Sequence, residues 1–307
     1  MNSKVSIIIP TYKRSNRIKR AIDSVLSQDY KNFELIVVDD NDPSDIERKL
    51  TEEAVNEYLS LPYFKYIQHD RNKNGSAARN TGIKASSGDY ITFLDDDDEY
   101  YPHKIGLQVQ ILNNLDHNIW GACYTLYDKI DQYGKLQVSS ELVEGNLLVQ
   151  ALSKNLYIGS GSNFMVTRKA LNDINGFDES FKRNQDLEFL VRLLTKYKMK
   201  SISSSTFLIH NEIRENKFTF EELMEINSKY RKTFKRTIDS LNTKEQSEVW
   251  RTLDLWDIRS AVSRRKYLSA IGIFRKSQLT LSDVFKYLIY ILKRLLTNKS
   301  YGFKLYN

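Results

Sequence analysis

Short apolar runs alternate with amphipathic stretches along the first hundred residues of the chain. Val5–Ile9 and Phe33–Val38 are continuous and rich in β-branched residues, which is typical of strands buried on both faces of a parallel sheet. Between them, apolar residues recur at helical spacing from Ile18 to Leu26. The same alternation predicts strands over 64–68 and 90–94 and helices over 45–59 and 77–85. The pattern indicates consecutive βαβ units, about half of a parallel sheet of the nucleotide-binding kind.

The remainder of the chain divides into a mixed part and a helical part. Trp120–Tyr127 and Ser162–Thr167 are predicted strands, and Asp186–Tyr197 is a predicted helix. From Phe218 onward the pattern is helical, without a clear strand. We therefore expect an α/β domain over residues 1–217, followed by a helical region over residues 218–307.

Polar clusters follow three of the predicted strands. They are Pro10-Thr11-Tyr12, Asp39-Asp40 and the acidic run from Asp95 to Asp98. In open α/β sheets, ligands bind in the crevice beyond the carboxyl ends of the strands. The three clusters are therefore expected to meet in one crevice.

The acidic run ends the stretch ITFLDDDDEY, in which five acidic residues follow a short apolar strand. Adjacent like charges repel, so a positive partner is expected. Clustered carboxylates suit a hard divalent cation, which prefers oxygen ligands. A solvated surface loop is the alternative, but the preceding strand is predicted to be buried. No glycine-rich phosphate loop follows any strand, so dinucleotide enzymes and P-loop kinases lack their signature, and a metal that bridges phosphates would take the place of such a loop.

Composition and cysteine content indicate a folded protein of a reducing compartment. Of the 307 residues, 41% are hydrophobic, and Cys123 is the one cysteine, which we expect to be a core residue. The apolar run near the N-terminus is too short for a signal peptide, and no window supplies the roughly 18 apolar residues of a spanning helix. We expect a cytoplasmic protein.

The formal net charge of +7 resides in the C-terminal third of the chain. Residues 218–307 hold 18 Lys and Arg against 9 Asp and Glu, whereas residues 1–217 hold 28 against 30. A basic region of this kind can meet nucleic acid or an anionic membrane. Because no nucleic-acid-binding motif accompanies the charge, we expect no nucleic-acid partner.

One C-terminal segment, DVFKYLIYILKRLL, has the pattern of an amphipathic basic helix. Its expected apolar face is made of Val284, Leu288, Ile291 and Leu295, widened by Phe285, Ile289 and Leu296. Such a helix can lie on anionic lipid, which would make the protein peripheral at the inner face of the cell membrane. An ordinary packing helix and a dimerisation module are the alternatives.

Five motifs, in order over about residues 4–212, resemble the family 2 glycosyltransferases, which have the GT-A fold: a Rossmann-like nucleotide-binding mixed sheet flanked by helices. The motifs are SIIIPTYKR with AIDSVLSQ, FELIVVDDN, GSAARNTGI, ITFLDDDDEYYP, and INGFDESF with NQDLEFLVRL. The family's fold implies a GT-A domain here, with the helical region as a C-terminal extension.

The resemblance also implies roles for individual residues. Pro10, Thr11, Tyr12 and Arg14 would lie at the nucleotide-sugar donor, with Asp40 accepting a hydrogen bond from the base, most simply uracil N3–H. Arg79 would approach the nucleotide or its diphosphate. In the DxD segment, Asp97 would be the principal Mn²⁺ or Mg²⁺ ligand, Asp96 would face the ribose or metal, and Asp95 would assist. Asp98 and Glu99 receive no role and are expected to be solvated.

Asp186 would be the base that deprotonates the acceptor hydroxyl. Many relatives have glutamate before this base, whereas this chain has Gln185, and losing that charge should lower the proton affinity of Asp186. Relatives also place a metal- or diphosphate-contacting histidine where His210 stands, and Arg214 could hold the diphosphate. The other three histidines, His69, His103 and His117, show no ligand spacing and are expected at the surface.

These residues together predict a metal-assisted, inverting transferase that moves a hexosyl or N-acetylhexosaminyl group from a UDP-sugar to a hydroxyl of a glycan or lipid-linked acceptor, in bacterial surface polysaccharide or glycoconjugate assembly. A nucleotidyltransferase is the enzymatic alternative, but it would normally carry a glycine-rich basic loop where this chain has PTYKRS. A catalytically inactive nucleotide-sugar-binding scaffold is the other alternative. The presence of both Asp97 and Asp186 argues against it.

Overall fold

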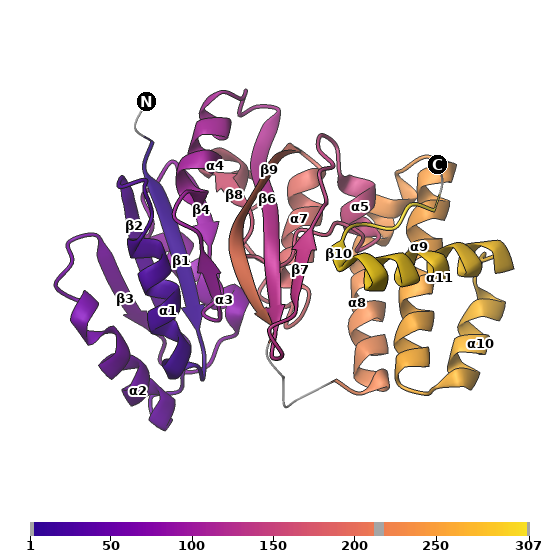
Figure 1. The fold of residues 1–307 in the computed structure, drawn as a ribbon, viewed down its shortest axis with the longest axis horizontal. Coiled ribbons are helices and arrows are strands. Elements are labelled where there is room, and N and C mark those ends of the chain that lie inside the picture. Colours follow the sequence, from indigo (N-terminus) through magenta and orange to yellow (C-terminus); the bar gives the residue numbers. More distant parts are fainter. Residues whose placement is uncertain (1–2, 212–217, 306–307) are drawn as a thin grey trace. The chain divides into compact units, whose positions relative to one another are not determined.

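The computed structural model describes residues 3–211 and 218–305. The described residues form two compact units, the first within residues 3–146 and 158–211 and the second within residues 147–157 and 218–305. Figure 1 shows their elements along the chain. Each unit is described by itself below.

Four parallel strands form one half of the sheet in the first unit. They are β1 (Val5–Thr11), β2 (Phe33–Asp39), β3 (Phe64–Gln68) and β4 (Tyr90–Phe93), in the spatial order β4-β1-β2-β3. All residues of β2 and β4 are buried, as expected for strands covered on both faces. The prediction of four parallel strands at these positions is confirmed.

Helices connect these strands: α1 (Ser15–Leu26), α2 (Ile46–Val55) and α3 (Gly75–Ala85). The α1 helix buries Ile18, Ile22 and Val25 completely, which is the face that the sequence predicts. The predicted helix over 45–59 ends at Val55 and continues as a short 3₁₀ turn, Asn56–Tyr58. At the start of α3, the side chain of Asn74 accepts hydrogen bonds from the N–H groups of Ser76 and Ala77.

The other half of the sheet is mixed. From β4 the order continues through β8 (Met165–Thr167), β6 (Trp120–Asp131) and β7 (Leu136–Ser139), all with antiparallel pairing. The long strand β9 (Lys198–Asn211) runs parallel to β6, and its outer end pairs with β5 (Asp98–Tyr100). The acidic stretch is therefore divided, because Asp98 and Glu99 belong to β5 rather than to a loop.

The helices of this half are α4 (Lys104–Asn113), α6 (Arg168–Asp173) and α7 (Gln185–Leu194). An aromatic cluster holds α7 against the sheet: the Phe189 ring lies 4.4 Å from that of Phe177 and 5.5 Å from that of Phe164 (centroid distances). Phe177 in turn meets Phe93 of β4 at 5.1 Å. The start of α7 is thereby fixed relative to the strand that leads into the acidic run. Cys123 is buried on β6, as predicted.

The second unit is helical apart from the two-residue strand β10 (Lys299–Ser300). It contains α8 (Phe220–Asp239), α9 (Thr243–Ser263), α10 (Tyr267–Lys276), α11 (Leu281–Thr297) and the short α5 (Leu148–Leu152). Capping boxes begin α8, α9 and α11. The hydroxyl of Tyr230 donates to Ala151 O and ties α5 to α8. The boundary expected from the sequence, at residue 217, would place residues 147–157 in the α/β domain, whereas in the structure they belong to the helical unit.

None of the helices in the described part of the chain is both long and apolar enough to cross a bilayer.

Candidate active site

A cavity of about 380 Å³ opens at the carboxyl ends of β1, β2 and β4. All eight residues that the sequence predicts at the donor line it: Pro10, Thr11, Tyr12, Arg14, Asp40, Arg79, Asp95 and Asp96. The three polar clusters thus meet in one crevice, as the sheet pattern predicts. Six further residues line it to which the sequence assigned no donor role: Asn72, Asn74, Gly75, Ala78, Lys182 and Gln185.

Arginine side chains neutralise the acidic run. Nη1 of Arg14 lies 2.7 Å from Oδ1 of Asp96 and 2.7 Å from Oδ2 of Asp97. Nη2 of Arg79 lies 2.6 Å from Oδ1 of Asp95. Burial raises the pKa of Asp96 to about 6, against the opposing effect of Arg14. The negative charge of the acidic run, for which the sequence predicts a cation, is therefore met first by the protein's own guanidinium groups.

Asp98 is buried, so the expectation that it is solvated is wrong. It starts β5 and is 2% exposed. Its Oδ2 accepts hydrogen bonds from Ser160 Oγ (2.8 Å) and Ser162 Oγ (2.6 Å), and Ser162 Oγ in turn accepts one from Asp95 N–H (2.9 Å). Burial raises the pKa of Asp98 well above its ordinary value. This carboxyl group supports the turn that presents Asp95.

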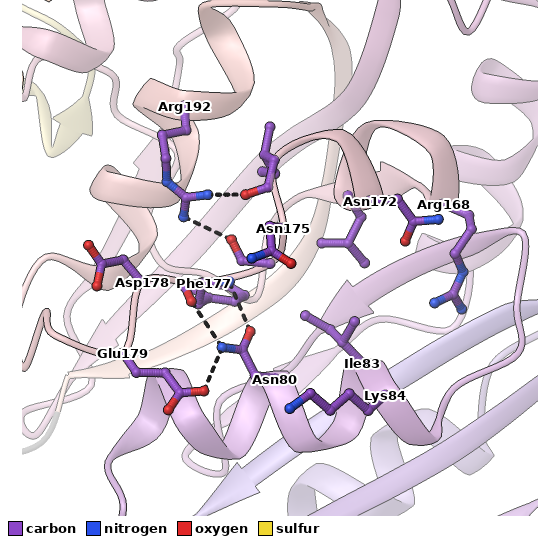
Figure 2. A pocket seen from close by; sticks show the side chains of 13 residues that line it. Asn80, Ile83, Lys84, Arg168, Asn172, Asn175, Phe177, Asp178, Glu179 and Arg192 are labelled. Carbon is purple, nitrogen blue, oxygen red and sulfur yellow. Dashed lines mark hydrogen bonds between the residues drawn. The ribbon is translucent and has the colours of Figure 1, made fainter.

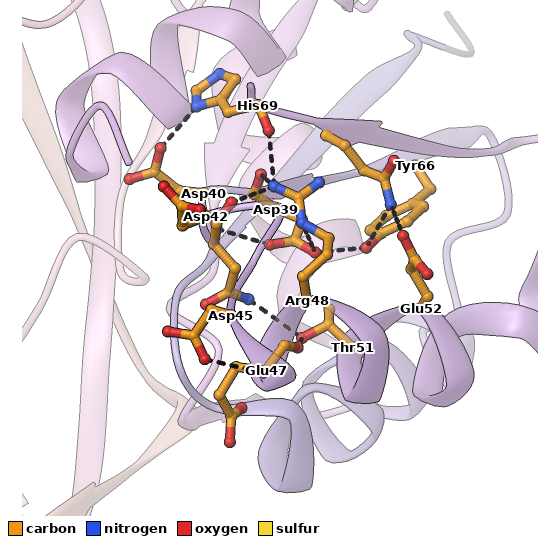
Figure 3. A network of polar contacts seen from close by, with 12 residues as sticks. Asp39, Asp40, Asp42, Asp45, Glu47, Arg48, Thr51, Glu52, Tyr66 and His69 are labelled. Carbon is orange, nitrogen blue, oxygen red and sulfur yellow. Dashed lines mark hydrogen bonds and ion pairs between the residues drawn. The ribbon is translucent and has the colours of Figure 1, made fainter. Parts of the chain in front are cut away.

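Asp40 and its neighbour Asp39 have different roles in the structure (Figure 3). Asp39 is fully buried, and its Oδ2 accepts a 2.5 Å hydrogen bond from Tyr66. Asp40 lines the cavity, and its two oxygens accept from four donors, two on each oxygen. These donors are His69 Nδ1, Asn72 Nδ2, Lys73 N and Asn74 N. The carboxylate is rigidly held, and its lone pairs are already used.

The prediction that His69 lies at the surface is wrong. The residue is 6% exposed, because the chain after β3 folds back over Asp40. Its Nδ1 lies 2.7 Å from Oδ1 of Asp40, and its Nε2 lies 2.8 Å from the hydroxyl of Thr81. Since an ionised carboxylate only accepts hydrogen bonds, Nδ1 carries a proton. His103 and His117 are half-buried.

Asp186 stands in the first turn of α7, after Asn184, which has a left-handed φ of 58°. Burial raises the pKa of Asp186, and the charge of Asp95 raises it further, whereas Arg79 lowers it. The preceding residue, Gln185, lines the cavity and accepts a 2.9 Å hydrogen bond from Arg79. Asp186 therefore lies beside the cavity, close enough to the acidic run for the charge of Asp95 to raise its pKa.

The sequence profile of glycosyl transferase family 2 matches residues 6–174. The chain belongs to this family. The predicted family is thus confirmed, and the match covers the parallel strands and the acidic run and ends at Ile174, before α7.

Curated relatives in this family share about a third of their aligned residues with the chain. An uncharacterized glycosyltransferase of Rickettsia felis is 34% identical over 62% of this chain, but the chain spans only 31% of its length. The GalNAc(5)-diNAcBac-PP-undecaprenol beta-1,3-glucosyltransferase of Campylobacter jejuni is 30% identical over 69% of this chain and 63% of the relative. The chain therefore spans less than two thirds of the relatives that it matches here.

Solved structures confirm the GT-A class. Residues 1–349 of S. aureus TarS, in complex with UDP, align with a TM-score of 0.53 at 16% identity, over 88% of this chain and 87% of that fragment. The mannosyltransferase PcManGT of Pyrobaculum calidifontis, in complex with GDP-Man and Mn²⁺, aligns with a TM-score of 0.58 at 17% identity, over 95% and 81% of the two chains. At these identities the likeness shows the fold alone.

In this family 2 protein, β5 and β9 bring His210 beside the acidic run. Nε2 of His210 lies 2.6 Å from Oε1 of Glu99, and Arg20 Nε lies 3.1 Å from the same oxygen. Glu99 is thus paired rather than simply solvated. The metal role of His210 stays a prediction, and Arg214 lies outside the described residues.

The donor set near Asp97 suits a hard cation only in part. Carboxylate oxygens are the ligands that Mn²⁺ and Mg²⁺ prefer, and Mg²⁺ is commonly held by one or two carboxylates together with substrate phosphates. Within residues 3–211 and 218–305 no group of three or more His, Cys, Asp or Glu is placed to hold a metal. Because Arg14 bridges Asp96 and Asp97, metal binding there requires its guanidinium to shift. The chemistry fits a cation that enters together with a diphosphate.

A larger cavity, about 870 Å³, lies between α3, α6, α7 and the loop that precedes α7 (Figure 2). Among the described residues, none of the predicted site residues lines it. Its polar contacts hold the loop: Asn80 donates to Phe177 O and to Glu179, and Arg192 donates to Gly176 O. Gly176 has a φ of 66°, and a Cβ there would lie 2.6 Å from Asn80 Oδ1. These contacts fix the segment that leads to Asp186.

Proposed function

We propose that the protein is an inverting glycosyltransferase that moves a sugar from a UDP-sugar to a hydroxyl of a glycan or lipid-linked acceptor. The observation that carries the proposal is the convergence of all eight predicted donor residues in one cavity, with Asp186 beside it. The nucleotidyltransferase alternative lacks any comparable support, because the chain belongs to glycosyl transferase family 2.

Asp186 is the proposed general base. Burial raises the pKa of Asp186, and a raised pKa makes its carboxylate a better proton acceptor. The base would take the acceptor's proton while the hydroxyl oxygen attacks the sugar's anomeric carbon from the face opposite the leaving nucleoside diphosphate. The C1–O bond to the diphosphate breaks as the new bond forms, so the anomeric configuration inverts.

Negative charge on the departing diphosphate would be met by Arg79, with Arg14 at the same cavity. Arg79 is 12% exposed, and its Cζ lies 5.5 Å from the ring centroid of Phe177, so the guanidinium is preorganised rather than extended into solvent. A bound Mn²⁺ or Mg²⁺, held by Asp97 with Asp95 and Asp96 nearby, would neutralise further charge on the phosphates.

Asp40 is the proposed acceptor for the N–H of the base. Because its lone pairs are taken by four donors, the base must replace one of them. The side-chain amide of Asn72, at 2.9 Å, is the one that lines the cavity and can rotate away. The UDP bound to TarS supports uracil as the base of the donor. The GDP-Man bound to PcManGT supports guanine instead, so the identity of the base has to be tested.

The lipid-linked acceptor and the setting are proposed from the relatives. The Campylobacter relative is named for an undecaprenol-linked glycan, and others are named for amylovoran and colanic acid biosynthesis. We infer a hexosyl or N-acetylhexosaminyl transfer in bacterial polysaccharide or glycoconjugate assembly, by an enzyme peripheral at the inner face of the cell membrane. A homo-oligomer joined through the helical unit is the alternative to membrane association.

A thermal-shift panel tests the donor and the metal together. The full chain is heated with UDP, GDP, UDP-glucose, UDP-galactose, their N-acetyl forms and GDP-mannose, each with and without Mn²⁺. Uridine nucleotides should raise Tm more than GDP does, and Mn²⁺ should add to the shift only when a diphosphate is present. A larger shift with GDP-mannose would overturn the uridine assignment.

A coupled assay of transfer to polyprenyl-diphosphate-linked saccharides then separates an enzyme from a scaffold. A protein that binds UDP-sugar but releases no UDP with any acceptor, even in the presence of Mn²⁺, would be the inactive scaffold. The anomeric configuration of the product, read by NMR coupling constants, tests inversion directly.

A further inference from the structure

The helix α11 shows a continuous apolar face to solvent. Seven side chains lie within an arc of about 120° when drawn at 100° per residue, and each is 37% exposed or more. They are Leu281, Phe285, Leu288, Ile289, Leu292, Leu295 and Leu296, with Leu296 at 83%. This is more apolar surface on one helix than solubility of a single chain favours.

The opposite side of α11 is the one that packs. Tyr287 and Tyr290 are buried in a cluster with Leu255 and Phe303, and Val284 and Ile291 pack at its edge. The apolar face expected from the sequence is thus split. Two of its four central residues, Val284 and Ile291, point inward, whereas Leu288 and Leu295 point outward. Packing within the second unit leaves the outward arc uncovered.

The charge around this arc has one sign. Residues 258–307 contain 11 Lys and Arg and one acidic residue, Asp283. Asp283 is 5% exposed, forms an ion pair with Arg251 and accepts hydrogen bonds from Thr280. On α11 the exposed charged side chains are Lys286 and Lys293, which flank one edge of the arc. The described surface of this helix therefore combines apolar side chains with cations and presents no carboxylate.

We propose that the outward arc of α11 docks on an anionic lipid surface. A helix of 17 residues is about 25 Å long and lies in the plane of the interface, with its leucines among the acyl chains and its lysines at the headgroups. A second copy of the chain fits less well, because an isologous contact would set the same cationic segment against itself. Because the exposed lysines of α11 complement anionic headgroups, we infer that the bilayer, rather than a second copy, covers the arc. This inference deepens the membrane setting of the proposed function by naming the surface that binds, and it does not depend on the reaction itself.

Co-sedimentation of the full chain with vesicles tests the proposal. Phosphatidylcholine vesicles with and without phosphatidylglycerol are compared at low and high NaCl. The protein should sediment with the anionic vesicles, less at high salt, and only weakly with phosphatidylcholine alone.

The variant Leu288→Ser/Leu292→Ser/Leu295→Ser should weaken binding to anionic vesicles by about tenfold or more, and Lys286→Glu/Lys293→Glu should weaken it comparably. The matched control is Leu59→Ser/Leu136→Ser/Leu142→Ser in the first unit, where the leucines are similarly exposed at 53%, 50% and 47%. This control should bind as the unchanged protein does. Thermal melts followed by circular dichroism establish that each variant is folded.

Three results would overturn the proposal. They are no sedimentation with either vesicle, equal sedimentation of the leucine variant, and a dimer that dissociates in the leucine variant while vesicles go unbound. The last result would assign the arc to a second copy. Transfer to a water-soluble acceptor should be unchanged in the leucine variant, so failure of docking and failure of the proposed reaction are told apart.

Discussion

Nη1 of Arg79 donates a 2.9 Å hydrogen bond to Oε1 of Gln185, the residue directly before the proposed base. The other guanidinium nitrogen, Nη2, pairs with Asp95 at 2.6 Å. Arg79 therefore bridges the acidic run and the start of α7 with one carboxylate and one neutral amide as partners. A glutamate in place of Gln185 would give the arginine a second carboxylate and would leave less of its charge for the diphosphate.

Replacing Gln185 by Glu should shift the pH profile and weaken donor binding. A new carboxylate beside Asp186 raises the pKa of the base, so the acid limb of kcat/KM should move to higher pH by up to about one unit. The KM for the donor should rise by about threefold or more, because Arg79 is more fully neutralised. The Gln185→Met variant removes the hydrogen bond without adding charge, so its acid limb should stay in place. If the acid limb does not move in Gln185→Glu, residue 185 does not influence the pKa of the base, and the proposed arrangement of Gln185 beside Asp186 is wrong.

The apolar pattern predicts the four parallel strands, because a strand covered on both faces has a continuous run of β-branched residues in the sequence. It also predicts the crevice, because the carboxyl ends of parallel strands lie at the same edge of the sheet. It does not predict the burial of Asp98 or His69. Their partners Ser160, Ser162 and Asp40 lie 29 or more residues away in the chain, and Thr81, the other partner of His69, lies 12 residues away. Likewise, the apolar face expected for α11 joins residues that pack, such as Val284, to residues that are exposed, such as Leu288, so periodicity alone could not tell its packed side from its open side.

Asp97→Asn tests the metal role. The variant should lose most of its transfer activity in saturating Mn²⁺, because the amide is a weaker ligand and carries no charge. Calorimetry should also show that Mn²⁺ no longer strengthens UDP binding, a readout that does not depend on turnover. Asp116→Asn, at an exposed turn, serves as the control and should behave as the unchanged protein does. Full activity of Asp97→Asn would remove this residue from the metal site.

Asp186→Asn should retain donor binding and lose transfer by about a hundredfold or more, the usual contribution of a positioned general base. In the unchanged protein, kcat/KM should fall as the pH drops, because the base acts only when deprotonated. The pKa of Asp186 is raised by burial, so this fall should begin at a higher pH than for an ordinary aspartate. If the variant transfers the sugar normally and binds UDP with unchanged affinity, a group other than Asp186 takes the proton of the acceptor hydroxyl.

Two buried carboxyl groups in the acidic run should make the ligand-free protein less stable as pH rises. Burial raises the pKa of Asp96 to about 6 and that of Asp98 well above its ordinary value. Between the unfolded and folded pKa values, the folded protein binds more protons than the unfolded chain does. The free energy of unfolding should therefore fall from about pH 4 to pH 6, by up to about 3 kcal/mol for Asp96. Urea unfolding across this range measures the slope.

Replacing Asp98 by Asn should flatten that slope, because an amide has no proton to lose and still accepts the hydrogen bonds of Ser160 and Ser162. Asp42→Asn serves as a control in which the effect on the pH slope has the opposite sign. Hydrogen bonds from Ser44 hold the pKa of Asp42 below its ordinary value, so this exposed residue adds stability as pH rises. Its loss should steepen the fall slightly. A slope that is unchanged in Asp98→Asn would mean that Asp98 is already ionised in the folded protein throughout the range.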